Sequence, residues 1–260
     1  MERFGDGVTV SVADGIAMLT LDRPATRNAM TEAMWMALPG CLDGLASDND
    51  VRVILVTGGS GHFCVGADVS EFQRVFVDAA AARAYNDLVH AGQEALTRVA
   101  KPTIAVVRGN AVGAGCGLAM ACDLRFASTD ARLAMPPARL GANYPFAGTR
   151  QLIHLVGPAR AKDMLFSGRL VGAEEALAIG LVDRVVAVDD LDQAALDYAN
   201  SVADLSASSN RATKQIVQAI LDGTDTETPE LKALFDNSFA GRDFREGYTA
   251  FLEKRKPVFR

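Results

Sequence analysis

Four closely spaced glycines mark the part of the chain best suited to chemistry. They are Gly109, Gly113, Gly115 and Gly117. They follow a β-branched apolar run at 103–107 and precede an apolar segment at 118–122. A strand, a glycine-rich turn and a buried helix in this order direct free backbone N–H groups toward one point, which suits an anion that is bound or that develops during a reaction. Alternatively, the glycines only allow close packing of helix on strand, and the residues alone leave both interpretations open.

A second glycine turn has the same relation to a strand. Residues 51–57 (VRVILVT) form a continuous apolar run, which is typical of a strand buried on both faces of a parallel sheet. Glycines follow at 58, 59 and 61, and Gly66-Ala67-Asp68 comes after a short apolar stretch. This turn is the counterpart of the first one.

The elements that must position these turns are strands alternating with helices. Alternating runs joined through Asp14-Gly15 predict a β-hairpin over 8–12 and 16–21. Further strands are expected at 103–107, 124–128, 132–135 and 184–188. This order predicts an α/β protein.

Helices are predicted by capping residues and apolar spacing. Thr31 can cap a helix that places apolar residues on one face; they are Met34, Leu38, Leu42 and Leu45. A long helix is expected at 79–99, and the irregular stretch 140–148 reads as an ordered loop. Helices resume at Thr149, with further start signals at Gly157-Pro158 and Gly172, and from about residue 189 the pattern is entirely helical.

Composition excludes several classes of function. The 260 residues carry a net charge of −6, so a basic surface for nucleic acid is not expected. The four cysteines form no CxxC pair and the three histidines are scattered, which disfavours a zinc site or disulfides and indicates a reducing compartment such as the cytoplasm. The N-terminus has no signal-peptide pattern, and no apolar run approaches the ~20 residues that a membrane span needs.

Five stretches of the sequence together resemble the crotonase superfamily, the enoyl-CoA hydratase/isomerase family. They are LDRPATRNAM (21–30), VRVILVTGGSGHFCVGADVSEF (51–72), KPTIAVVRGNAVGAGCGLAMACDLRFAS (101–128), RLVGAEEALAIGLVDRVV (169–186) and FREGYTAFLEKRKPVF (244–259). The resemblance implies a spiral of ββα units over 1–188 and a helical C-terminal trimerisation region over 189–260. It also implies a homotrimer or a dimer of trimers. The ligand would be an acyl-CoA thioester, with no metal and no further cofactor.

The resemblance also assigns roles to single residues. The two glycine turns would face each other as an oxyanion hole whose donors are the Ala67 and Ala114 amides. Coenzyme A would be bound by residues from three regions. Two of these residues, Phe235 and Lys254, would reach the coenzyme A of a neighbouring subunit. The full set is Arg27, Ala29, Ala67, Asp68, Val69, Phe235 and Lys254.

The sequence departs from the family where a hydratase needs its acid and base. The resemblance places the family's two glutamates at Gly117 and Pro137, and neither residue carries a proton. Asp68 is close to the expected hole, but in the family it serves architecture. Asp123 is expected to make a structural hydrogen bond. The usual hydration mechanism therefore lacks both of its groups.

The stretch MPPARLGANYPFAGTRQL resembles the corresponding loop of methylmalonyl-CoA decarboxylases. Tyr144 matches the tyrosine that those proteins place in the active site, although they carry histidine at the Ala67 position and proline at the Asn143 position. Decarboxylation needs an enolate hole but no strong base, so lyase chemistry is favoured over hydration. Tyr144 is either a hydrogen-bond donor to the reacting group or an aromatic wall. Asn143 and Phe146 are expected to lie near the thioester with it, and His62 is a further candidate outside this loop.

Other functions compete with this interpretation. The chain could be a non-catalytic acyl-CoA-binding protein that keeps the hole without turnover. A dinucleotide-binding dehydrogenase is disfavoured because the central glycines do not follow G-x-G-x-x-G. A serine hydrolase is disfavoured because G-x-S-x-G is absent.

Overall fold

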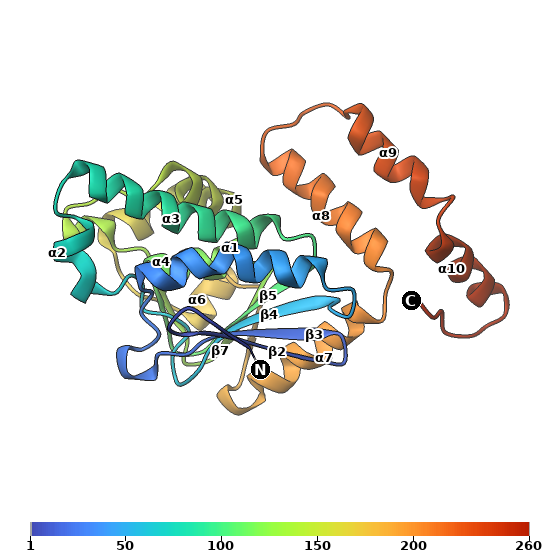
Figure 1. The fold of residues 1–260 in the computed structure, drawn as a ribbon, viewed down its shortest axis with the longest axis horizontal. Helices are drawn as coiled ribbons and strands as arrows, with labels where there is room; N and C mark the ends of the chain where they lie inside the picture. Colours follow the sequence, from blue (N-terminus) through green and yellow to red (C-terminus); the bar gives the residue numbers. More distant parts are fainter. Residues whose placement is uncertain (1, 260) are drawn as a thin grey trace.

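The computed structural model describes residues 2–259 (Figure 1). Its strands are β1 (Glu2–Phe4), β2 (Val8–Ala13), β3 (Ile16–Leu21), β4 (Val53–Gly58), β5 (Thr103–Val107), β6 (Asn110–Val112), β7 (Leu124–Ser128), β8 (Arg132–Ala134), β9 (Val171–Gly172) and β10 (Arg184–Val186). Its α-helices are α1 (Glu32–Ser47), α2 (Phe72–Val75), α3 (Ala79–Arg98), α4 (Ala114–Ala121), α5 (Phe146–Ser167), α6 (Ala173–Ala178), α7 (Leu191–Ala203), α8 (Ala207–Leu221), α9 (Pro229–Ser238) and α10 (Arg242–Leu252). Short 3-10 helices lie at Pro24–Thr26, Val69–Glu71, Pro137–Leu140 and Val188–Asp190.

Seven strands form the main sheet, in the order β1-β2-β3-β4-β5-β7-β10. The first three pair antiparallel, and the predicted hairpin is confirmed: Asp14 and Gly15 both have positive φ, as a two-residue hairpin turn requires. From β3 to β10 the strands are parallel. The completely buried β5 and the mostly buried β4 explain the continuous apolar runs in the sequence.

A second sheet, in the order β6-β8-β9, takes every other strand of the middle of the chain. β5 lies in the main sheet and β6 in the small one, and β7 and β8 repeat this division before α5 begins. Each of these two pairs of strands, with the helix that follows it, therefore adds one strand to each sheet. This is the spiral of ββα units that the resemblance implied.

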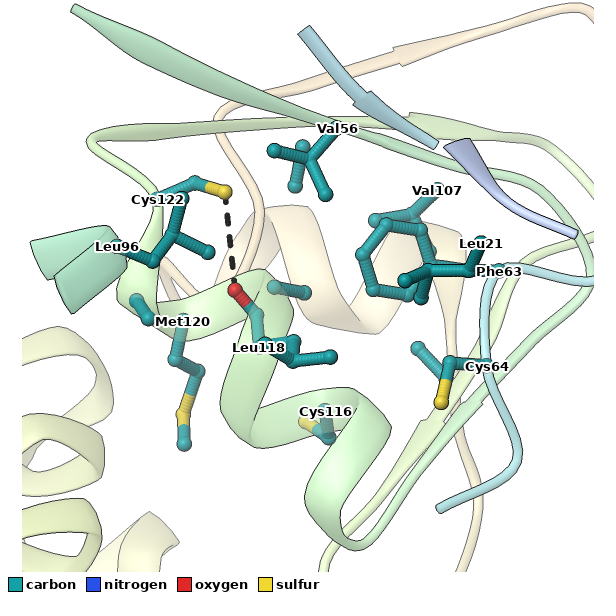
Figure 2. Close-up of a cluster of buried hydrophobic side chains, with 14 of the residues drawn as sticks. Leu21, Val56, Phe63, Cys64, Leu96, Val107, Cys116, Leu118, Met120 and Cys122 are labelled. Carbon is teal, nitrogen blue, oxygen red and sulfur yellow. Dashed lines mark hydrogen bonds between the residues drawn. The ribbon is translucent and has the colours of Figure 1, made fainter. Parts of the chain in front are cut away.

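Helices cover both faces of the main sheet (Figure 1). α1, α3 and α4 lie on one face, where they share the larger hydrophobic core, and α7 packs on the other face. Figure 2 shows the larger core around Phe63, Leu118 and the thiols of Cys64 and Cys116. The helix predicted after Thr31 is confirmed, because the Thr31 hydroxyl caps it by accepting the Met34 N–H and its apolar face is buried.

The irregular stretch before α5 is shorter than the sequence suggested. α5 begins at Phe146, not at Thr149, because Pro145 is extended (φ −60°, ψ 152°) and serves as the residue before the first turn. Gly157 has φ 76° and ψ 164°, which breaks α5 immediately before Pro158. The predicted helix start at Gly157-Pro158 is therefore the start of the second half of α5.

The C-terminal helices α8, α9 and α10 project from the core (Figure 1). An ion pair anchors the start of this region: Lys214 Nζ lies 2.8 Å from Asp123 Oδ2, which also accepts the Thr103 N–H at 2.7 Å. The predicted structural role of Asp123 is thereby confirmed. No helix within residues 2–259 is both long and apolar enough to span a membrane.

The close approach of α4 to the chain after β4 brings the two glycine turns together. Cys64 is hydrogen-bonded on both sides to β6, through its N–H to Asn110 O (3.0 Å) and from Val112 N–H to its carbonyl (2.9 Å). β6 leads directly into α4, so the first turn of α4 lies on this segment. A Cβ on Gly115 would overlap the Cys64 carbonyl oxygen and lie 2.8 Å from its carbon. Close packing is thus one real function of these glycines.

We expect Gly115→Ala to destabilise the fold by about 1–3 kcal/mol, because the Cys64 carbonyl is fixed by β6 and cannot retreat. The matched control is Gly44→Ala in α1, where an added Cβ meets nothing within 4 Å. That change should stabilise the protein by up to about 1 kcal/mol through helix propensity. Thermal unfolding midpoints of the two variants should therefore move in opposite directions. Equal midpoints would contradict the steric argument.

Candidate active site

The turn at Gly66-Ala67-Asp68 is held by the backbone of Met30. The Met30 N–H donates to Gly66 O and the Asp68 N–H donates to Met30 O, both at 2.8 Å. The Gly66 carbonyl and the Asp68 N–H, on either side of Ala67, are therefore both hydrogen-bonded to Met30. The Ala67 N–H itself donates to no acceptor within residues 2–259. It takes no part in the pairing with Met30.

The Asp68 carboxylate is a structural group. Its Oδ2 lies 2.8 Å from Arg23 Nη1, and its Oδ1 accepts the N–H and the hydroxyl of Ser70 at 3.0 and 2.6 Å. The Ser70 hydroxyl, and Arg23 beside it, hold the pKa of Asp68 below its usual range despite partial burial. Both oxygens are engaged and the group stays ionised, so Asp68 shapes the turn and is poorly suited to act as a base.

Arg23 and Asn28 tie the preceding loop to this turn. Arg23 Nη1 also donates to Ala29 O at 2.7 Å. The Asn28 side chain is buried and donates to His62 O at 2.8 Å while accepting the Arg23 N–H at 3.0 Å. The sequence assigned no role to Asn28 or Arg23, because both also act through partners distant in sequence.

These contacts bring five of the predicted ligand-binding residues into one region. They are Arg27, Ala29, Ala67, Asp68 and Val69. The Val65 N–H donates to Arg27 O at 3.3 Å, and the Arg27 side chain is exposed at the surface beside the turn. Val69 is also exposed. A cation and an open edge therefore lie next to the free Ala67 amide.

The turn before α4 supplies the second free amide. Gly113 adopts φ 54° and ψ −118°, and its N–H donates to Ala134 O at 2.9 Å. Ala114 is the first residue of α4, and its N–H has no acceptor within the described chain. A Cβ built on Gly66 would lie 3.7 Å from Ala114 N, so the two turns adjoin. The arrangement presents two free N–H groups from neighbouring turns.

The space beside Gly117 is filled by two polar side chains. A Cβ on Gly117 would lie 2.6 Å from Tyr144 Oη and still closer to Gln93 Nε2. A Cβ on Gly148 would overlap the Tyr144 ring. Tyr144 thus occupies a space that exists because residues 117 and 148 are glycines. Burial raises the pKa of Tyr144 above its ordinary value, so it is a neutral phenol that can donate a hydrogen bond.

Gln93 is the residue of this site that sequence reasoning missed. It lies within α3, where its position in an alanine-rich helical pattern gives no signal of a special role. Only the packing of α3 against α4 places its carboxamide beside Gly117.

The remaining candidates lie at the margin of the site or outside it. Pro137 begins the 3-10 helix Pro137–Leu140 and has no ionisable group. Asn143 and Phe146 are exposed. His62 Nδ1 accepts the Asn110 N–H at 3.1 Å, which commits one ring nitrogen to the fold.

Phe235 and Lys254 are not brought to this site within one chain. Phe235 lies on α9 and Lys254 follows α10, and both helices are far from α4 in Figure 1. Arg255, next to Lys254, is engaged by Glu246 at 2.6 Å. The predicted role of Phe235 and Lys254 at a neighbouring subunit's ligand stays a prediction.

Two thiols flank the adjoining turns without being reactive. Cys64 and Cys116 are buried and unpaired, and burial raises the pKa of each to about 12. Both are protonated at neutral pH, and a thiol nucleophile is therefore not part of the chemistry. What the site offers is a pair of backbone donors, a neutral phenol and a carboxamide.

Comparison with known proteins agrees with this architecture. The sequence model described as enoyl-CoA hydratase/isomerase matches residues 11–260. The chain is 33% identical over 243 residues to the short-chain-enoyl-CoA hydratase of Clostridium acetobutylicum, covering 93% of this chain and 92% of that protein. It is 34% identical over 247 residues to the mitochondrial enoyl-CoA hydratase of Pongo abelii, covering 94% and 83%.

Solved structures give the same result. A protein from Hyphomonas neptunium, assigned to the enoyl-CoA hydratase/isomerase family, superposes with a TM-score of 0.95 at 40% identity, covering 97% of each chain. An enoyl-CoA hydratase/carnithine racemase from Magnetospirillum magneticum superposes with a TM-score of 0.94 at 30% identity, covering 99% of this chain and 97% of that one. The chain belongs to the enoyl-CoA hydratase/isomerase family of the crotonase superfamily.

Proposed function

We propose that this protein is an enzyme that binds acyl-CoA thioesters, holds a thioester enolate between the Ala67 and Ala114 amides, and favours decarboxylation of malonyl-type thioesters over hydration. The names of its relatives, which include enoyl-CoA hydratases, support a coenzyme A thioester as substrate. The observation that carries the choice of reaction is the surroundings of Gly117. The heavy atoms nearest to a Cβ there belong to Gln93 and Tyr144, and none of these atoms is a carboxylate oxygen.

The two free amides suit an oxyanion that forms during reaction. They belong to adjoining turns that are fixed by backbone pairing, so little reorganisation is needed when charge develops on the thioester oxygen. One donor of this kind contributes roughly 3–4 kcal/mol of transition-state stabilisation. The hole stabilises an enolate whichever bond is broken to form it.

Hydration requires groups that this chain lacks at the expected places. The family resemblance puts the acid and the base of a hydratase at Gly117 and Pro137. Asp68, the nearest carboxylate of the turn, is saturated by Arg23 and Ser70. No activated water can therefore be held between two carboxyl groups in the usual manner.

Decarboxylation needs only the groups that are present. The bond between the α-carbon and the carboxylate breaks, CO₂ leaves, and the electron pair forms the thioester enolate whose oxygen the two amides hold. A proton from solvent then adds to the α-carbon and gives the shortened acyl thioester. Tyr144, a neutral phenol, donates a hydrogen bond to the departing carboxylate.

The proposed coenzyme A contacts lie on the loop and turn around Ala67. Arg27 is an exposed cation beside Ala29, Asp68 and Val69, and it can meet the ligand's phosphates in an otherwise acidic protein. Phe235 and Lys254 would complete the site of a neighbouring subunit in a trimer or a dimer of trimers. The exposed aromatic row on α9 and α10, which begins at Phe235 and continues to Tyr248, supports such an assembly.

The central test is a screen of malonyl-, methylmalonyl- and crotonyl-CoA by mass spectrometry. We expect loss of CO₂ from a malonyl-type thioester and no efficient gain of water by crotonyl-CoA. Hydration with kcat/KM of about 10⁴ M⁻¹s⁻¹ or more would contradict the proposal. Binding of all three thioesters without turnover would favour the non-catalytic alternative.

The Tyr144→Phe variant tests the role of the phenol. It should lower kcat for CO₂ release about tenfold or more while leaving the Kd of propionyl-CoA unchanged. An unchanged kcat would make Tyr144 a wall of the pocket only.

Ala114→Pro removes one proposed oxyanion donor without removing a fold contact. Ala114 is the first residue of α4, where proline is tolerated and its N–H has no partner in the described chain. We expect kcat to fall roughly 10²–10³-fold with an unchanged circular dichroism spectrum. The matched control is Ala79→Pro, at the same position of α3 and exposed, which should keep full activity. Equal activity of the two variants would rule out the Ala114 amide as a donor.

The assembly is tested by the mass in solution. One chain has a mass of 27.5 kDa, and we expect light scattering at micromolar concentration to give three or six times that value. The physical reason is the groove of about 840 Å³ between α8, α9 and α10. Its lining combines polar residues with large apolar ones such as Leu234, Phe235 and Phe244, which a single chain leaves uncovered. A mass of one chain would exclude a site shared between subunits.

A further inference from the structure

The carboxamide of Gln93 is a buried donor without an acceptor. Its Nε2 is inaccessible to solvent and makes no hydrogen bond within residues 2–259. A buried N–H group that makes no hydrogen bond lowers the stability of the fold, and such groups in native structures call for an explanation. The proposed function assigns no role to Gln93.

The fold fixes where this donor points. The preceding residue, Gly92, packs on α1 so closely that a Cβ there would lie 2.9 Å from the Trp35 ring. Leu96, one turn later, is buried in the same core. With α3 held at both positions, the Gln93 side chain is directed toward Gly117 of α4.

Two donors from different elements therefore meet at one point. Tyr144 Oη and Gln93 Nε2 are the nearest polar atoms to the missing side chain of Gly117. The Gln93 carboxamide is close enough to the phenol to lower the pKa of Tyr144 against the larger effect of burial, but Nε2 makes no hydrogen bond of acceptable geometry. Both groups are uncharged. The neighbouring Glu94 is turned away and pairs with Arg98 at 2.7 Å. An acceptor within reach of both groups would receive hydrogen bonds from both of them.

The chemistry of this pair selects a carboxylate. An alkyl acyl chain would leave both donors unpaired, whereas an anionic acceptor makes stronger hydrogen bonds than a neutral one. A cationic side chain here would stabilise the substrate carboxylate as an ion pair and oppose its loss. Neutral donors can orient the carboxylate without that effect.

We propose that Gln93 is a specificity-determining residue that binds, together with Tyr144, the carboxylate on the acyl group of the substrate. The inference rests on the proposed function for the position of the acyl group. It extends that function by assigning the recognition of the carboxylate to a residue on α3.

The test compares two thioethers of coenzyme A that cannot react. S-(2-carboxyethyl)-CoA matches a malonyl thioester in length and carries the carboxylate, and S-propyl-CoA lacks it. Isothermal titration calorimetry should show that the wild-type protein binds the first about tenfold or more tightly than the second. Gln93→Met, of similar volume but without donors, should lose about tenfold of this preference and bind S-propyl-CoA unchanged.

A matched glutamine separates recognition from folding. Gln151 Nε2 already donates to Met120 O at 2.6 Å, so Gln151→Met should lower the thermal midpoint and keep the preference for the carboxylate. Gln93→Met removes a donor that has no partner in the described chain and should not lower the midpoint. Gln93→Leu serves as a second variant should Gln93→Met fail to fold.

The outcomes distinguish this inference from the proposed function. A wild-type protein without preference between the two thioethers, or a Gln93→Met variant that keeps the preference, overturns the inference even if CO₂ is released. A preference lost in Gln93→Met supports it even if no CO₂ is released, and in that case only the proposed reaction fails.

Discussion

The contact between the first turn of α4 and the segment after β4 is the constraint on which the rest of the site depends. Gly115 lies against the Cys64 carbonyl, and that carbonyl is already bonded to β6. Neither side can withdraw, so the turns that carry Ala67 and Ala114 must adjoin. The position of the two free amides is a consequence of this packing.

Electrostatics fix the Ala67 turn without supplying a catalytic base. Arg23 bridges the Asp68 carboxylate and the Ala29 carbonyl, and Ser70 takes the other oxygen. These partners favour the ionised form of Asp68, which is a weak base because both of its oxygens already accept hydrogen bonds. The charge closest to the two amides therefore serves the shape of the turn.

Sequence alone predicts what local signals determine. The run at 103–107 matches β5 to the residue, and the Asp14-Gly15 turn and the Thr31 cap are as expected, because each depends on neighbours a few residues away. Contacts between distant segments carry no such signal: Arg23 and Asp68 are 45 residues apart, and Gln93 meets Gly117 only through helix packing. The two adjoining turns could be predicted from their glycines and a family resemblance, whereas the polar side chains around them required coordinates.

Tyr144 and Gln93 occupy the space into which a side chain at position 117 would project. A side chain at position 117 would collide with Tyr144 Oη and Gln93 Nε2, and a side chain at position 148 would collide with the tyrosine ring. A glutamate at 117 would therefore require the Tyr144 hydroxyl and the Gln93 carboxamide to move. The space that could hold an acid for hydration instead holds two neutral donors. In the proposed function, packing around α4 thus leaves neutral donors, and no carboxylic acid, beside position 117.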